Sequence, residues 1–296
     1  MRVFVTGASG WIGTGVTRQL LAADHEVVGL ARSEAAEAIV RVSGGTPLRG
    51  DLDDLEVLDK GARDADAVIH CAFIHDFGNY EKSVVVDRRA IETLGGAIAD
   101  TGKLLLVTSG TVADAEGRAG TELDEPRPGF PRKSEQTAFG IPGVRASVVR
   151  LPQVHGREAR GFVSTLIAIA REKGVSAYIG DGQNRWSAVY RDDAAQLYRL
   201  ALEDGTAGRR YHAVADEGVP MRDIAAVIGR RLDLPVRSIA PDAAAGHFGW
   251  LGAFAGLDLV TSSALTREWL NWTPTGLSLL DDLEHGTYFE ARPAAA

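Results

Sequence analysis

The sequence predicts an α/β protein built on a doubly wound parallel sheet, with a smaller C-terminal lobe. Apolar runs of β type alternate with segments of helical periodicity, and this alternation predicts parallel strands. The first run, Arg2–Thr6, leads directly into a glycine turn, Gly7 to Gly13, and then into a helical pattern. The length of 296 residues is enough for one such sheet plus a second lobe.

The composition excludes several classes of protein. With 45% hydrophobic and 24% charged residues, the chain is an ordinary globular protein. The net charge of −8 is scattered along the sequence, which argues against nucleic acid as a main partner. Cys71 is the only cysteine, so there is no intrachain disulfide, and we expect no metal site. Since no leader or membrane span is evident, we expect a cytoplasmic protein without a membrane partner.

The first half of the chain alternates regularly between the two kinds of element. Short apolar runs rich in β-branched residues predict strands, and apolar residues spaced by three or four predict the helices between them. After Arg2–Thr6, the expected strands are Glu26–Ala31, a short one near Pro47–Arg49, Ala67–Ala72, Lys103–Thr108 and Ala146–Leu151. The expected helices are Trp11–Ala23, Ser33–Ala38, Asp53–Ala62, Glu81–Ala99 and Lys133–Phe139.

Beyond Leu151 strand and helix patterns no longer alternate regularly, which indicates that the chain leaves the sheet and returns. We expect a helix at Phe162–Glu172, a strand at Ala177–Arg185 with a turn at Gly180-Asp181-Gly182, a helix at Arg191–Leu202, a last sheet strand at Tyr211–Ala215 and a helix at Met221–Leu232. The predicted division is a dinucleotide-binding Rossmann-type domain, residues 1–155 with 188–215 returning to it, and a substrate-binding lobe, residues 156–187 and 216–296.

The glycine turn is the strongest functional signal. Gly7 permits a tight turn, Gly10 lets the backbone approach a pyrophosphate, and Gly13 lets the helix pack closely on the strand. The start of the following helix offers free N–H groups to the phosphates. We therefore expect a dinucleotide to bind at this turn, through the glycines and their neighbours Thr6, Ser9, Trp11 and Ile12.

The end of the second strand favours NADP(H) over NAD(H). Arg32 can face a 2′-phosphate as a permanent cation, and Ser33 can donate a hydrogen bond. Glu34 lies close enough to leave NAD(H) as an alternative. After the third strand, Asp51 and Leu52 are expected near the adenine, although Asp51 could equally cap the helix expected from Asp53.

Taken together, these segments resemble the short-chain dehydrogenase/reductase superfamily, in its extended and atypical branches. The resemblance rests on Thr6–Gly13 and continues through Asp51-Leu52, His70–Phe73, Val107–Ser109, Val149–Gly156, Val189–Ala194 and Leu270–Pro274. It implies a nicotinamide cofactor and a small-molecule substrate. It also implies further cofactor contacts from Cys71, Ala72, Phe73, Thr108, Lys133, Pro152, Val154 and His155.

The superfamily's Tyr-x-x-x-Lys pair, which normally does the acid/base work, is missing. Pro131 stands at the expected tyrosine position and Glu135 at the lysine position. By its place in the resemblance, Ser109 is the candidate hydroxyl beside the substrate, unless it only caps a loop. The candidate proton donors are His75, Asp76, His155, Tyr178 and Tyr190. Of these, His75, His155 and Tyr190 are preferred, and a structural role is an open alternative for each.

These features predict an NADP(H)-dependent reductase of a C=N or C=O bond. An imine fits the missing tyrosine better, because an iminium carbon accepts hydride without a strong acid. Trp186, Phe248, Trp250 and Phe254 could line an apolar substrate pocket, or could simply belong to the core. The alternative is a non-catalytic NADP(H)-binding regulator or scaffold. A homodimer formed through the helices Glu81–Ala99 and Lys133–Phe139 is also possible in this superfamily.

Overall fold

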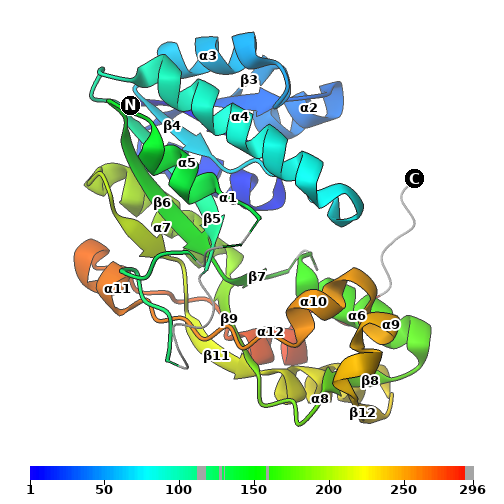
Figure 1. Cartoon of the computed structure of the whole chain (residues 1–296). Coiled ribbons are helices and arrows are strands. Elements are labelled where there is room, and N and C mark those ends of the chain that lie inside the picture. Colours follow the sequence, from blue (N-terminus) through cyan, green and yellow to red (C-terminus); the bar gives the residue numbers. More distant parts are fainter. Residues whose placement is uncertain (112–117, 127–128, 130, 158–159, 291–296) are drawn as a thin grey trace.

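The structure, a computed structural model, describes residues 1–111, 118–126, 129, 131–157 and 160–290 (Figure 1). A large parallel sheet with helices on both faces stands above a smaller lobe. The prediction of a Rossmann-type α/β fold is confirmed. Residues 158–159 and 291–296, which were assigned to the lobe, lie outside the described part.

The main sheet has seven parallel strands in the order β10-β6-β5-β4-β1-β2-β3. Because β1 lies between β2 and β4, the order reverses there, and sheets of this kind bind ligands outside the carboxyl ends of the strands at such a point. The strands are β1 (Arg2–Thr6), β2 (Glu26–Ala31), β3 (Thr46–Arg49), β4 (Ala67–His70), β5 (Leu104–Gly110), β6 (Arg145–Leu151) and β10 (Arg210–His212).

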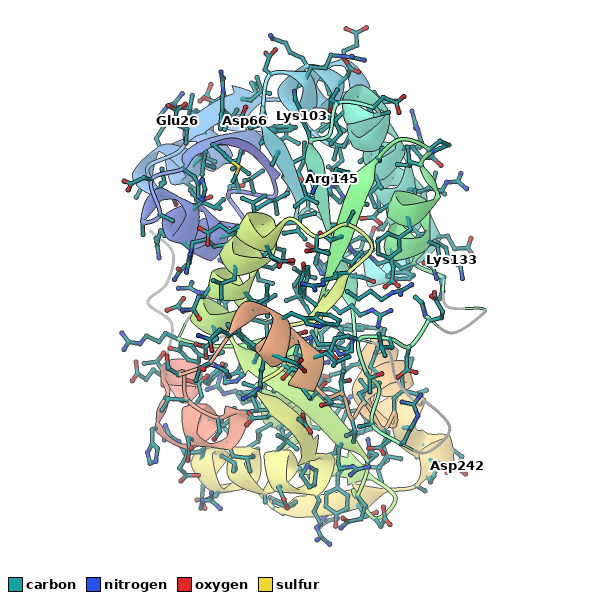
Figure 2. The ribbon with its side chains drawn as sticks, turned by 90° about the vertical axis from the view of Figure 1, so that its left-hand side faces the viewer. Glu26, Asp66, Lys103, Lys133, Arg145 and Asp242 are labelled. Carbon is teal, nitrogen blue, oxygen red and sulfur yellow. The ribbon has the colours of Figure 1, made fainter. Side chains whose placement is uncertain are left out.

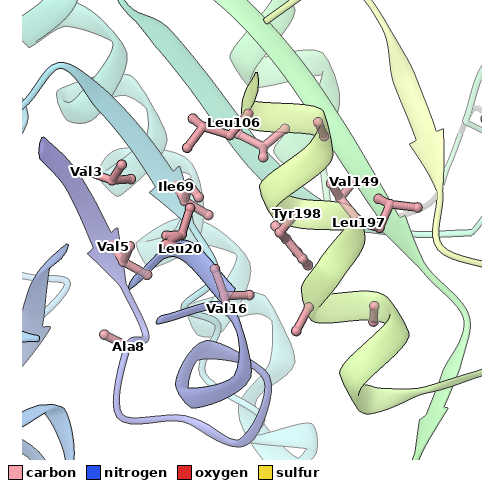
Figure 3. Close-up of a cluster of buried hydrophobic side chains, with 14 of the residues drawn as sticks. Val3, Val5, Ala8, Val16, Leu20, Ile69, Leu106, Val149, Leu197 and Tyr198 are labelled. Carbon is pink, nitrogen blue, oxygen red and sulfur yellow. The ribbon is translucent and has the colours of Figure 1, made fainter. Parts of the chain in front are cut away.

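Alternate side chains of the strands fill two cores, one on each face of the sheet. Val3 and Val5 contribute to the core with α1, α2 and α7 (Figure 3). Phe4, between them, contributes to the core with α3, α4 and α5. The helices are α1 (Trp11–Leu21), α2 (Glu34–Val42), α3 (Leu55–Arg63), α4 (Tyr80–Ile98), α5 (Ser134–Gly140) and α7 (Arg191–Asp204).

The lobe is built on two small sheets. One is three-stranded, in the order β11-β9-β7, and the other is the parallel pair β12-β8. The strands are β7 (Gln153–His155), β8 (Ser176–Ile179), β9 (Arg185–Tyr190), β11 (Asp216–Pro220) and β12 (Val236–Ile239). The helices are α6 (Phe162–Lys173), α8 (Met221–Leu232), α9 (Ala244–Phe248), α10 (Gly252–Ala255) and α12 (Leu279–His285). The remaining helix of this part of the chain, α11 (Ala264–Leu270), packs instead against β10 and α7 of the main sheet.

One predicted element of the lobe is wrong. The single strand expected over Ala177–Arg185 is two strands, β8 and β9, which belong to different sheets. The chain breaks between them because Gly180 and Gly182 both have positive φ, +60° and +68°. Residue types that favour strands on both sides of this turn made the two strands look like one.

The two edges of the main sheet differ in character. Glu26, Asp66, Lys103 and Arg145 lie at the amino ends of neighbouring strands (Figure 2). Three of these side chains bind backbone atoms at that edge: Asp66 accepts from Arg2, Lys103 donates to Arg63, and Arg145 donates to the carbonyl oxygens of Gly102 and Gly205, each at 2.7 Å. The carboxyl ends of β5 and β6 point the other way, toward the lobe (Figure 1). A functional site at the switch point therefore lies between sheet and lobe.

A buried ion pair joins β6 to α5 near the edge of the sheet. Arg150 is fully buried and donates twice to the Glu135 carboxylate, at 2.8 and 2.9 Å. The guanidinium of Arg210 binds the same carboxylate. Arg150 Nη1 also donates to Nε2 of His212, 3.1 Å away, so the proton of this imidazole lies on Nδ1 and is donated to the Ser262 carbonyl oxygen at 2.7 Å. Nε2 of His212 can accept this hydrogen bond only when the imidazole is neutral.

This arrangement predicts a loss of stability in mild acid. Burial and the adjacent Arg150 charge lower the pKa of His212 to about 3. Below the unfolded-state pKa of about 6.5, the unfolded chain takes up a proton that the folded chain refuses. The His212 contribution to the free energy of unfolding should therefore fall by about 2 kcal/mol between pH 7 and pH 5. Urea denaturation of wild type and His212→Asn at both pH values measures it.

The variant should lose about 2 kcal/mol less than wild type over this interval. The exposed His285 provides the control, since His285→Asn should keep the wild-type pH dependence. Equal pH dependence in wild type and His212→Asn would show that His212 becomes protonated inside the fold.

Candidate functional site

The glycine turn brings β1, α1 and the end of β4 into close contact. Gly7 has φ +71°, and a Cβ there would lie 2.8 Å from the backbone nitrogen of Ala72. A Cβ at Gly13 would lie 2.0 Å from the carbonyl oxygen of Gly7. Both positions exclude any larger residue, because the clash is with backbone and cannot relax by a side-chain rotation.

The first turn of α1 is left open to a ligand. Gly10 is its N-cap residue and has no side chain to accept a hydrogen bond, and the first turn contains no acidic residue. Backbone N–H groups and the helix dipole there suit an anion. The residues present thus fit the pyrophosphate of a dinucleotide. A hollow of about 340 Å³ adjoins this turn, and its lining comes from α1, α2 and Arg160.

The residues predicted to select the cofactor lie at the end of β2. Arg32 is exposed and has no ion-pair partner among the described residues. Ser33 caps α2 by accepting a hydrogen bond from the Ala36 backbone at 3.2 Å, which leaves its hydroxyl proton available to a ligand. This pair can therefore receive a phosphate group without breaking a protein contact other than the cap.

Asp51 caps the turn that follows β3. Its Oδ1 accepts from the backbone nitrogens of Asp53 and Asp54, at 2.9 and 3.2 Å. The capping role predicted for Asp51 is thus present, but α3 begins later than expected, at Leu55. Leu52 packs at the margin of the core shared with α3 and α4. Contact of either residue with an adenine stays a prediction.

Cys71 and Thr108 direct their side chains into the protein. Thr108 Oγ1 donates to the His70 carbonyl oxygen at 2.8 Å and lies 2.7 Å from the Tyr198 hydroxyl. Burial raises the pKa of the Cys71 thiol to about 12, although hydrogen bonds with Thr108 and Tyr198 lower it in part. Any contact of Cys71 or Thr108 with a cofactor would therefore come from their backbone atoms.

Ser109 differs from its neighbour Thr108. It stands one residue before the end of β5 and is half-buried. Within the described part of the chain, its hydroxyl has no hydrogen-bond partner, so it can still bind a substrate. The structure thus keeps Ser109 as the candidate hydroxyl at the carboxyl edge of the sheet.

Arg132 is a site residue that the sequence analysis missed. Its guanidinium lies over the Phe73 ring, 4.0 Å from the centroid. Nε donates to Ser134 Oγ at 2.7 Å and Nη2 donates to the Thr108 carbonyl oxygen at 2.9 Å. The Asp87 carboxylate lies 3.5 Å from Nη2. Arg132 therefore places a fixed cation at the carboxyl ends of β4 and β5.

A chain of buried polar groups supports this cation. Asp87, which is 1% exposed, accepts from Ser134 at 2.5 Å and lies 3.3 Å from Nε2 of His70. Nδ1 of His70 lies 2.8 Å from the hydroxyl of Thr6, at the start of the glycine turn. Burial opposes ionisation of Asp87, but the His70 hydrogen bond and the Arg132 charge hold the pKa of its carboxyl below the usual value.

His75 lies beside this cluster. Its ring meets the edge of the Phe73 ring, with centroids 5.3 Å apart. Burial, together with the Arg132 charge, lowers the pKa of His75. The imidazole is consequently neutral at pH 7 and carries no proton that it readily gives up, so the structure does not strengthen His75 as a proton donor.

His155 lies in the interior and not at the site surface. It is 0% exposed, and its Nδ1 lies 2.9 Å from the Asp282 carboxylate. Tyr288 donates to the same carboxylate at 2.8 Å and accepts from the Gly156 backbone at 2.7 Å. The ring of Tyr190 meets His155 edge-on, with centroids 5.6 Å apart. His155 ties β7 to α12, which leaves no access for a substrate.

The two residues at the expected tyrosine and lysine positions have no catalytic geometry. Pro131 is exposed and precedes α5, which begins at Ser134 rather than Lys133. Glu135 is held by Arg150 and Arg210. The Lys133 ammonium group makes no hydrogen bond to any described residue. Of this segment, only Arg132 reaches the carboxyl ends of β4 and β5.

The other predicted contact residues surround the turn. Ile12 and Val154 pack against the core of the α1 face, and Pro152 links β6 to β7. Gly161, just before α6, lies beside Trp11, since a Cβ on Gly161 would lie 3.9 Å from the Trp11 ring. The structure therefore brings Gly161 close to the residue that begins α1.

Aromatic side chains of the lobe form a second cluster. Phe162 contacts both Trp250 and Phe254, with ring centroids 5.3 and 5.2 Å apart. Trp186 and Phe248 are buried and belong to the lobe core. Trp250 is 41% exposed. Of the aromatic residues considered for an apolar pocket, Trp250 thus remains the most accessible.

Among the described residues, no three histidine, cysteine or acidic side chains are grouped so that they could hold a metal ion. No helix in the same part of the chain is long and apolar enough to cross a membrane.

Comparisons with known proteins agree with the fold. The family model described as RmlD substrate binding domain matches residues 1–247. The chain is 50% identical over 295 residues to the uncharacterized protein C2A9.02 of Schizosaccharomyces pombe, covering 98% of this chain and 100% of that protein. It is 28% identical over 239 residues to the 4-hydroxy-2-methyl-3-oxo-4-farnesyl-3,4-dihydroquinoline-1-oxide ketoreductase of Stigmatella aurantiaca, covering 75% and 70%.

A solved structure of similar fold is the UDP-glucuronic acid 4-epimerase of Bacillus cereus, in complex with UDP-glucuronic acid and NAD. It matches with a TM-score of 0.76 and 19% identity over 98% of this chain and 99% of that chain. The family match covers well over half of the sequence, and the sheet order and glycine turn agree with it. The chain therefore belongs to the RmlD substrate binding domain family, within the extended short-chain dehydrogenase/reductases.

Proposed function

We propose that this protein is an NADP(H)-dependent reductase of a C=O or C=N bond in a small, apolar substrate. The observation that carries the proposal is the uncapped start of α1 at Gly10 together with Arg32 at the end of β2, which is exposed and has no ion-pair partner in the described part of the chain. The first suits a pyrophosphate and the second a 2′-phosphate. The bound dinucleotide would supply hydride.

Two further observations support reduction. Ser109 offers a hydroxyl without a protein partner among the described residues, at the carboxyl edge of the sheet. The Stigmatella relative is a ketoreductase whose named substrate carries a 3-oxo group and a farnesyl chain. That name also agrees with an apolar substrate, for which the exposed Trp250 of the lobe provides a contact surface.

The chain's own residues would act by binding and orientation. Ser109 would hold the substrate by a hydrogen bond, and Trp11, with the neighbouring Gly161, would shield the site from water. No tyrosine lies in the first turn of α5, so the proton of the product would come from water or from Tyr190.

We further expect a cytoplasmic protein, and a homodimer that pairs α4 and α5, where Val85 is 46% exposed.

The second candidate is a regulator or scaffold that binds NADP(H) without turnover. The observation that favours it is the first turn of α5, where Glu135 is held in a structural ion pair and Pro131 precedes the helix. This candidate shares the cofactor site with the first, so only turnover separates them.

The cofactor preference can be tested at Arg32. Arg32→Gln should raise the dissociation constant for NADPH about 10-fold to 100-fold, because charge-assisted hydrogen bonds to a phosphate are worth about 1.5–3 kcal/mol. The constant for NADH should change less than about twofold, because NADH lacks the phosphate. Titrations followed by nicotinamide fluorescence measure both. The exposed Arg237 in the lobe gives the control variant, Arg237→Gln. A parallel loss for both cofactors would contradict the preference.

Turnover can be tested with a panel of ketones, aldehydes and cyclic imines. The wild-type protein should consume NADPH with at least one class, followed as loss of the nicotinamide absorbance band. Ser109→Ala should lower kcat about 10-fold to 100-fold with unchanged NADPH affinity, because it removes one hydrogen bond to the reacting group. Tight NADPH binding without consumption of any substrate would favour the regulator instead.

A further inference from the structure

We propose that Arg132 binds the oxygen of the substrate's carbonyl group, so that a carbonyl compound, and not an iminium ion, is the substrate class. The proposal rests on the reductase function given above and deepens it. It rests on the position, restraint and free donors of one guanidinium group.

Arg132 is held in one orientation before any ligand binds. Its planar group stacks on Phe73, 4.0 Å from the ring centroid, and donates to Ser134 and to the Thr108 carbonyl oxygen at 2.7 and 2.9 Å. Only 13% of its side chain is exposed. A donor fixed in this way loses little entropy when it binds a further acceptor, which is the condition for stabilising charge that develops during a reaction.

The guanidinium still has hydrogen-bond capacity. Nε and Nη2 make the contacts with Ser134, Thr108 and Asp87, and Nη1 has no partner among the described residues. Nη1 is also not fully buried, because it is not one of the buried polar atoms that lack a hydrogen-bond partner in the described part of the chain. A ligand can therefore reach two N–H groups of a side chain that is otherwise fixed.

The position of Arg132 links it to the predicted site. Thr108 and Phe73 stand at the carboxyl ends of β5 and β4, and Ser109 is the next residue along β5. The Gly7 turn meets the same end of β4 at Ala72. Arg132 is thus on the edge of the sheet where the glycine turn and the Ser109 hydroxyl are found.

The sign of the charge selects the substrate class. Reduction of a carbonyl adds hydride to carbon, and the electron pair of the C=O π bond moves to oxygen, which becomes negative. A guanidinium beside this oxygen lowers the energy of that charge. Reduction of an iminium ion instead starts from a cation, which the same guanidinium repels. Arginine keeps its own protons, so the alkoxide takes its proton from water or from Tyr190.

This assignment reverses the preference drawn from the sequence. The missing tyrosine favoured an imine, because an iminium carbon needs no acid. Arg132 supplies a different aid, a fixed positive charge that stabilises an oxyanion without transferring a proton. Asp87 partly balances that charge, 3.5 Å away, but it lies behind the guanidinium in the buried polar chain.

The first test uses an anion and a cation of similar size as probes. Benzoate and benzylammonium are titrated calorimetrically into the protein saturated with NADP⁺ or NADPH. Benzoate should bind wild type at least about tenfold more tightly than benzylammonium, because a carboxylate fits the guanidinium fork. Arg132→Met should weaken benzoate binding by at least about tenfold, and Arg132→Lys by less, because lysine keeps the charge. NADPH affinity should stay within threefold, as measured by fluorescence.

Arg88→Met is the matched control, because Arg88 on α4 is exposed and, among the described residues, pairs with Glu92 alone. It should bind both probes like wild type. Absent benzoate binding in wild type, equal benzoate affinity in Arg132→Met, or tighter binding of benzylammonium would each overturn the proposal. A loss of NADPH affinity with unchanged benzoate affinity would also overturn it, since Arg132 would then be a cofactor contact.

A kinetic arm separates this proposal from the reductase function. In Arg132→Met, kcat/KM for a ketone should fall about 100-fold, the effect typical of losing one oxyanion donor, and guanidinium ion in solution should restore part of it. If benzoate binds through Arg132 but no carbonyl or imine is reduced, the reductase function fails and the anion site stands. If ketone reduction proceeds equally in wild type and Arg132→Met, the reductase function stands and this proposal fails.

Discussion

The contact between Gly13 and the carbonyl oxygen of Gly7 sets the place where α1 begins. Because the helix packs directly on the turn that ends β1, its first N–H groups lie at the carboxyl edge of the sheet. The end of β4 approaches the same turn through Ala72. Every other part of the candidate site is arranged around this crowded junction, which tolerates no side chain larger than hydrogen at either glycine.

Two buried charge clusters adjoin α5 through its first two residues and have different partners. In one, Glu135 accepts from Arg150 and Arg210 and joins the helix to the edge of the sheet. In the other, Ser134 connects Arg132 to Asp87. Neighbouring residues at the start of one short helix therefore contact a structural ion pair and the Arg132 cation.

Whether a feature could be predicted from the sequence depends on how far apart in the chain the residues that determine it lie. The strands β1 and β2 and the glycine turn could be predicted because their signals lie within a few residues. The cluster around Arg132 could not, since Asp87 and Ser134 are 47 residues apart and nothing local marks them as partners. The structural role of His155 could not be predicted for the same reason. Its partner Asp282 is 127 residues away, and only the packing of the C-terminal segment reveals it.

The lone cysteine has a practical consequence. Its sulfur is enclosed between β4 and α7, bound to Thr108 and Tyr198, and burial keeps it protonated. A thiol in this state does not react with alkylating reagents or oxidants until the surrounding strand ends separate. The chain has no second thiol that could react instead. The rate at which Cys71 is modified would therefore measure how often the structure opens locally at the glycine turn.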